Sequence, residues 1–168
     1  MRSITFVLSC FLALGAFAQE GFDDALKLIN SEQYEEAEKV FASLLESDPA
    51  NGDLYYYYGE ALIRDYFSDT LANSLEEFVS QAEDLFQKGL EQDPGNALNL
   101  AGMGAVVLMR TGDTTQAQGY FDKAEATIPT RARQITQEHA VLLIKMGQAQ
   151  LFSPVINYPR AIYYLCLL

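Results

Sequence analysis

The feature that most constrains the fold of this chain is a spacing that occurs three times. An alanine is followed by an aromatic residue four positions later and by a proline eight positions after that. The three sets are Ala37, Phe41 and Pro49; Ala82, Phe86 and Pro94; and Ala117, Phe121 and Pro129. Residues four apart share one face of an α-helix, and proline cannot continue a helix. The spacing therefore predicts three related helices that each end before their proline.

Helical periodicity extends over the rest of the chain after the first eighteen residues. Apolar residues recur at helical spacing, glycine and proline separate the segments, and sustained period-2 alternation is lacking. Ser74 followed by Glu77 is a typical helix start. The predicted fold class is all-α, with helices at about 22–29, 34–45, 53–67, 75–90, 97–110, 117–124 and 131–150, and another from Tyr158.

The helices form pairs that resemble tetratricopeptide repeats of a bacterial exported type. Besides the alanine, aromatic and proline positions, the resemblance is carried by first-helix residues: Tyr55, Tyr58 and Gly59 in one repeat, and Ala105 and Leu108 in the next. It implies an α-solenoid of antiparallel hairpins in which these residues form the core. About three repeats are complete, and Ala161 and Leu165 belong to an incomplete fourth.

The spacing of the repeats departs from the family in two places. The key alanines lie 45, 35 and 44 residues apart, against about 34 in a plain repeat. About ten extra residues are therefore expected near 64–80 and near 145–158, emerging on one edge of the stack. Gly104 stands where the family prefers a larger residue, which predicts looser packing in the third repeat.

The first eighteen residues are typical of a cleaved signal peptide. Arg2 is followed by an apolar stretch over residues 4–17, and Ala16-Phe17-Ala18 fits a signal peptidase site. We expect cleavage before Gln19, no stable membrane span afterwards, and a helical repeat domain over residues 19–168 that is incomplete at its C-terminus. The predicted location is periplasmic or envelope-associated. Lipidation at Cys10 is a minor alternative, because cleavage there leaves a very short hydrophobic region.

The charge and the residue types argue against several functions. The net charge is −12 and no run of Lys and Arg is present, which disfavours binding to nucleic acid. The single histidine, His139, has no nearby nucleophile motif and no further ligands at metal-site spacing. The carboxylates mostly follow polar helix faces. We therefore expect no enzyme activity, no cofactor and no metal.

A candidate binding face comes from the run Tyr55–Tyr58. If Tyr55 and Tyr58 are core residues, Tyr56 and Tyr57 point toward the inner, concave face of the solenoid, because helix neighbours lie about 100° apart. Solvent exposure without a binding role is the alternative for these two tyrosines. The hypothetical partner-binding residues are Tyr56, Tyr57, Glu60, Ile63, Asn99, Met103, Met109 and Arg110. This surface is mostly aromatic and apolar, so the carboxylate clamp of some family members is not expected.

The predicted function is a non-catalytic protein-interaction scaffold that binds a protein or peptide through the concave helix face. The alternatives are the N-terminal interaction region of a longer exported enzyme or sensor, and a structural subunit of an envelope assembly. The last segment, Ala161–Leu168, is apolar on every side, whereas a terminal repeat needs a polar outer face. We expect this segment to continue into further repeats or to dock on a partner, with self-association as one outcome.

Overall fold

The computed structural model describes residues 20–168; the predicted signal peptide lies outside them. Within this range the secondary structure is helical and contains no strand, which confirms the all-α fold class. After a helical segment over residues 20–30 come α2 (Tyr34–Ser47), α3 (Gly52–Ser68), α4 (Leu75–Gln92), α5 (Ala97–Thr111), α6 (Thr114–Glu125), a 3₁₀ turn at Ala132–Gln134, α7 (Gln137–Leu151) and α8 (Tyr158–Leu165). None of the helices in this range has the length and apolar character needed to cross a membrane.

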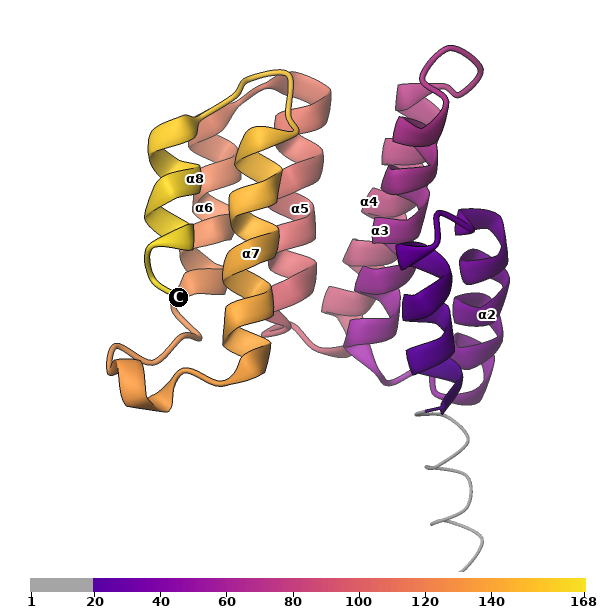
Figure 1. Cartoon of the computed structure of the whole chain (residues 1–168), viewed down its shortest axis with the longest axis horizontal. Helices are drawn as coiled ribbons and strands as arrows, with labels where there is room; N and C mark the ends of the chain where they lie inside the picture. Colours follow the sequence, from indigo (N-terminus) through magenta and orange to yellow (C-terminus); the bar gives the residue numbers. More distant parts are fainter. Residues whose placement is uncertain (1–19) are drawn as a thin grey trace, which may run out of the picture.

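Most helices pack against their neighbours in the sequence. The contacts run from α2 to α3, then through α4 and α5 to α6, and again between α7 and α8 (Figure 1). In addition, α5 contacts both α3 and α7, which are not its sequence neighbours. The helices α3, α5 and α7 therefore adjoin one another with α5 in the middle, and this row carries the candidate site.

The helices from α3 to α8 start at side-chain caps, whereas α2 has no side-chain cap hydrogen bond at Gln33. Ser74 accepts a hydrogen bond from the backbone N–H of Glu77, as its spacing predicts, and Asp113 accepts two from the first turn of α6. Helix α7 begins at Gln137 and not near residue 131, because Thr136 caps it. The Thr136 side chain accepts a hydrogen bond from the backbone N–H of His139, and the His139 imidazole accepts one from the backbone N–H of Thr136. This reciprocal pair satisfies two backbone groups that helix starts leave unpaired. His139 is thus part of a helix cap.

The repeated alanines and aromatic residues form seams between helices. Ala37, Ala82, Ala117 and Ala161, and the rings of Phe41, Phe86 and Phe121, are each at most 1% exposed, and Leu108 is fully buried. The prolines at 49 and 94 lie exposed in turns, and Pro129 is half-buried. The core is therefore built around the small and aromatic positions, while the prolines lie between helices.

Glycines on α3 and α5 make room for the rings of Phe86 and Phe121. A Cβ atom added to Gly59 would lie 2.4 Å from the ring of Phe86, and one added to Gly102 would lie 2.8 Å from its other side. A Cβ at Gly104 would lie 2.8 Å from the ring of Phe121. The expectation of loose packing at Gly104 is wrong, because the ring of Phe121 takes the space of the missing side chain.

The tyrosine run and the last helix differ from the sequence-based assignment. Tyr55 and Tyr58 are only half-buried, whereas Tyr56 is 6% exposed. In α8 the fully buried aromatic is Tyr164, and Leu165, expected in the core, is 42% exposed. Leu165 nevertheless faces α7, since a Cβ added to Gly147 would lie 3.3 Å from its side chain.

The extra residues mostly lengthen helices. Residues 64–68 and 75–80 belong to α3 and α4, with a short connection between them, and residues 145–151 belong to α7. The α3–α4 and α7–α8 connections emerge on the same edge, at the top of Figure 1. Several side chains from these parts of α3 and α7 line the site described next.

Candidate functional site

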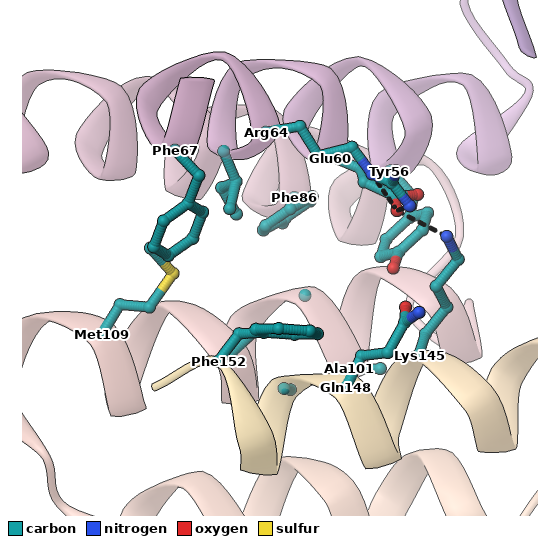
Figure 2. Close-up of a pocket in the computed structure, with 14 residues that line it drawn as sticks. Tyr56, Glu60, Arg64, Phe67, Phe86, Ala101, Met109, Lys145, Gln148 and Phe152 are labelled. Carbon is teal, nitrogen blue, oxygen red and sulfur yellow. Dashed lines mark hydrogen bonds and ion pairs between the residues drawn. The ribbon is translucent and has the colours of Figure 1, made fainter. Parts of the chain in front are cut away.

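A pocket of about 340 Å³ lies between α3 on one side and α5 and α7 on the other (Figure 2). Its lining comes from four helices and the residue that follows α7, so distant parts of the sequence meet there. The lining residues are Tyr56, Glu60, Ile63, Arg64, Phe67, Phe86, Ala101, Gly102, Ala105, Met109, Lys145, Gln148, Ala149 and Phe152.

One end of the pocket is apolar. Phe67 from the last turn of α3 lies next to Met109 of α5, and the ring of Phe152 lies opposite, just after α7 (Figure 2). Phe67 is 46% exposed and Phe152 is 66% exposed, whereas Met109 is buried. Two large rings thus stand in solvent on facing walls. Exposed aromatic side chains that line a concave apolar surface are typical of binding sites.

The floor combines a core ring with small residues. Phe86 is 1% exposed, lines the pocket, and stacks on Tyr56 with the ring centroids 5.6 Å apart. Ala101, Gly102 and Ala105 face the pocket from α5. Because these residues of α5 have small side chains, they leave the space between α3 and α7 open.

The other end of the pocket carries three charged groups. Oε1 of Glu60 accepts hydrogen bonds from the Arg64 Nε, 3.0 Å away, and from the Lys145 ammonium (Figure 2). The side chains of Glu60 and Lys145 are 12% and 15% exposed, and that of Arg64 is 35% exposed. The Glu60–Lys145 pair joins α3 to α7 across the pocket, 85 residues apart in sequence.

The second oxygen of this carboxylate is unusual. Within the described residues, Oε2 of Glu60 is buried and accepts no hydrogen bond. A buried acceptor without a partner is costly, particularly on a charged group. The local charge is also informative: with one carboxylate and two cations, this end of the pocket carries a net charge of about +1 in a chain whose net charge is −12.

Two tyrosines adjoin this charged cluster. Burial, and secondarily the Glu60 carboxylate, raises the pKa of Tyr56 well above its usual value and that of Tyr57 to about 12. Both phenols therefore remain protonated at neutral pH. The Lys145 ammonium also lies 5.9 Å from the centroid of the Tyr57 ring, a cation–π distance.

A second, more polar concavity of about 640 Å³ lies near the N-terminal parts of α3, α5 and α7. Tyr57 lines it together with Phe22, Leu98 and the start of α7, including His139. Lys145 connects the two concavities, because it lines the first and lies over the Tyr57 ring of the second. The neighbouring tyrosines 56 and 57 thus line two different concavities.

The structure brings together half of the predicted partner-binding residues. Tyr56, Glu60, Ile63 and Met109 line the pocket, and Tyr57 lines the second concavity. Ala105, expected in the core, is half-buried and faces the pocket.

The remaining three predicted residues lie elsewhere. Asn99 is fully buried, and its Nδ2 donates to the Gly52 carbonyl, which ties α5 to the start of α3. Met103 is 6% exposed in the core. Arg110 lies outside the pocket, where it pairs with Glu83 and Glu76 of α4. None of the three presents a free side chain to a ligand in the pocket.

Several pocket residues escaped the sequence reasoning, among them Phe67, Lys145, Gln148 and Phe152. All four fall in the segments that the repeat spacing assigned to insertions. A signal was available for Phe67, which follows Ile63 by four residues and Glu60 by seven and so shares their face of α3. Lys145, Gln148 and Phe152 lie on or just after α7. Which side of the helix they occupy could be assigned only once the start of α7 was known.

The pocket offers apolar surface from its aromatic and small side chains, and hydrogen-bonding groups at its charged end. Among residues 20–168 no group of three or more His, Cys, Asp or Glu side chains is placed to hold a metal ion. Comparison of the sequence with protein-family models and with curated proteins finds no match.

Proposed function

We propose that the chain is a protein-interaction scaffold built as a solenoid of tetratricopeptide-like hairpins, and that its partner, a protein or peptide, binds on the concave face formed by α3, α5 and α7. The observation that carries this proposal is the pocket itself. Exposed aromatic side chains from the ends of two different helices face each other across a floor of small residues. Large aromatic residues in such concave surfaces are typical anchors of protein interfaces.

The other features of the chain are consistent with this role. The signal-like N-terminal sequence supports export, so the expected partner is a protein of the periplasm or envelope. The interaction needs no cofactor, since the lining offers apolar area and a small set of hydrogen-bonding groups. The partner's affinity would come from burying the exposed parts of Phe67 and Phe152, side chains whose full burial contributes about 1.5–3 kcal/mol each.

Site-specific photocrosslinking in the native host tests the proposal. A benzophenone amino acid at Phe67 should crosslink a defined protein, whereas the same group at Lys88, which is exposed on α4, should not. The variant Phe152→Ala removes a wall that is mostly exposed, so it should reduce the crosslink without unfolding the protein. Equal crosslinking from positions 67 and 88, or a crosslink unaffected by Phe152→Ala, would show that the pocket is not the binding site.

A further inference from the structure

The charged end of the pocket restricts what the partner can place there. A third cation would meet Arg64 and Lys145, which already surround Glu60. An anion would find those cations, but it would also lie beside the unpartnered Oε2 of Glu60. A purely aliphatic or phenyl side chain would leave that buried oxygen without a hydrogen bond. The arrangement favours a neutral group that donates a hydrogen bond.

The rest of the pocket restricts the shape of that group. Its walls are the rings of Phe67 and Phe152 with Met109, and Phe86 forms part of its floor. Its volume of about 340 Å³ is at the small end for binding pockets, which span roughly 300–1,000 Å³. This space suits one large flat side chain. The two cations at the polar end favour an electron-rich ring, and among aromatic side chains tryptophan gives the strongest cation–π interaction.

We propose that the partner places a tryptophan side chain in this pocket, with its ring among Phe67, Phe86 and Phe152 and its indole N–H donated to Oε2 of Glu60. This inference rests on the proposed function and specifies its ligand. Tryptophan is the side chain that combines a wide apolar ring with a single N–H donor and no charge. Because Oε2 is covered, the donor reaches it only when side chains at the polar end shift; Arg64 is the most exposed of the three.

The chain itself offers a direct assay, because it contains no tryptophan. Indole fluorescence in a mixture therefore reports only on the probe. The probe is the capped tripeptide Ac-Ala-Trp-Ala-NH₂, titrated with the purified protein. Two matched peptides, one with phenylalanine and one with glutamate, serve as competitors. A third, with 1-methyltryptophan, has the ring but no N–H donor and is titrated on its own, because its indole also fluoresces.

The expected result is saturable binding with a shift of the indole emission to shorter wavelength. The 1-methyl peptide should bind at least about tenfold more weakly, which corresponds to the loss of one hydrogen bond to a charged acceptor. The variant Glu60→Gln should remove most of that discrimination. Ala105→Phe should abolish binding by filling the pocket, and Ala72→Phe, which adds the same bulk at an exposed loop position, should not.

Circular dichroism of each variant establishes whether it is folded. If Ala105→Phe is unfolded, Phe152→Ala, which removes one wall of the pocket, replaces it as the variant expected to lose binding. The inference is overturned if the tryptophan peptide does not bind, if the 1-methyl or phenylalanine peptide binds equally well, or if the glutamate peptide binds best. These outcomes leave the proposed function intact where crosslinking at Phe67 still captures a partner. The separate result that would refute the proposed function is equal crosslinking from positions 67 and 88.

Discussion

Replacing Gly59 with alanine tests how closely the helices are packed around the Phe86 ring. The new Cβ would lie 2.4 Å from Cε1 and 2.8 Å from Cζ of that ring, well inside the usual carbon–carbon separation of about 3.5–4.0 Å. The ring has little room to move, because its other side lies against Gly102 and Tyr56 stacks on it. Overpacking of this kind costs about 1–3 kcal/mol.

The chain contains a matched control for this substitution. Gly119 lies in the middle of α6 and has no atom within 4 Å of the position that a Cβ would take. Replacing glycine with alanine in a helix interior raises the free energy of unfolding by about 0.5–1 kcal/mol through helix propensity alone. That gain is common to both sites and cancels in the comparison. Gly119→Ala should therefore be more stable than Gly59→Ala by about 1–3 kcal/mol, with Gly119→Ala above the wild type.

Urea unfolding followed by far-UV circular dichroism measures both variants. A third and a fourth variant, Phe86→Leu alone and combined with Gly59→Ala, complete a double-mutant cycle. In the Phe86→Leu background the added methyl group should cost much less, because the ring that it meets is gone. If Gly59→Ala is as stable as Gly119→Ala, or if the cycle shows no coupling between positions 59 and 86, the seam between α3 and α4 is not packed as described.

Two further predictions concern groups outside the pocket. Burial, followed by the nearby charges of Asp65 and Glu35, raises the pKa of Glu38 from its usual 4.5 to about 7, so its contribution to stability is fully present below about pH 4.5 and is lost as the pH rises through 7. Glu38→Gln should remove this dependence and be more stable than the wild type at pH 8 in the same urea assay; an unchanged pH profile would contradict the assignment. Asn99→Ala removes the side-chain donor to the Gly52 carbonyl and should cost about 1–3 kcal/mol. It should leave binding of the tryptophan peptide unchanged, and a selective loss of binding with unchanged stability would refute the structural role given to Asn99.

The sequence predicted the helices and the seams well, because both depend on local spacing. Ala82 and Phe86 are four residues apart, and on any helix they must share a face. The start of α7 was predicted less well, since its cap pairs Thr136 with a histidine where Glu or Gln is usual. The choice between Tyr164 and Leu165 also depended on one residue of helix phase, which the apolar α8 sequence does not fix.

The candidate site was predicted only in part, because it depends on contacts between distant helices. The α3 side was found, since Tyr56, Glu60 and Ile63 recur at helical spacing on one face. The α7 side was not, because nothing near Lys145 in the sequence indicates that it reaches Glu60, 85 residues earlier. Asn99 shows the opposite error: a polar side chain on a first helix suggests a binding residue, but here it satisfies a backbone carbonyl of α3.

Core and pocket share one residue in a way that affects how binding can be tested. Phe86 is at once the ring that α3 and α5 enclose and part of the pocket floor. A substitution there changes stability and binding together, and a bound partner must in turn stabilise the fold, because it binds only the folded state. Ala105 and Ala149 differ, since both line the pocket but are only half-buried. Variants at these two positions can therefore separate recognition from folding.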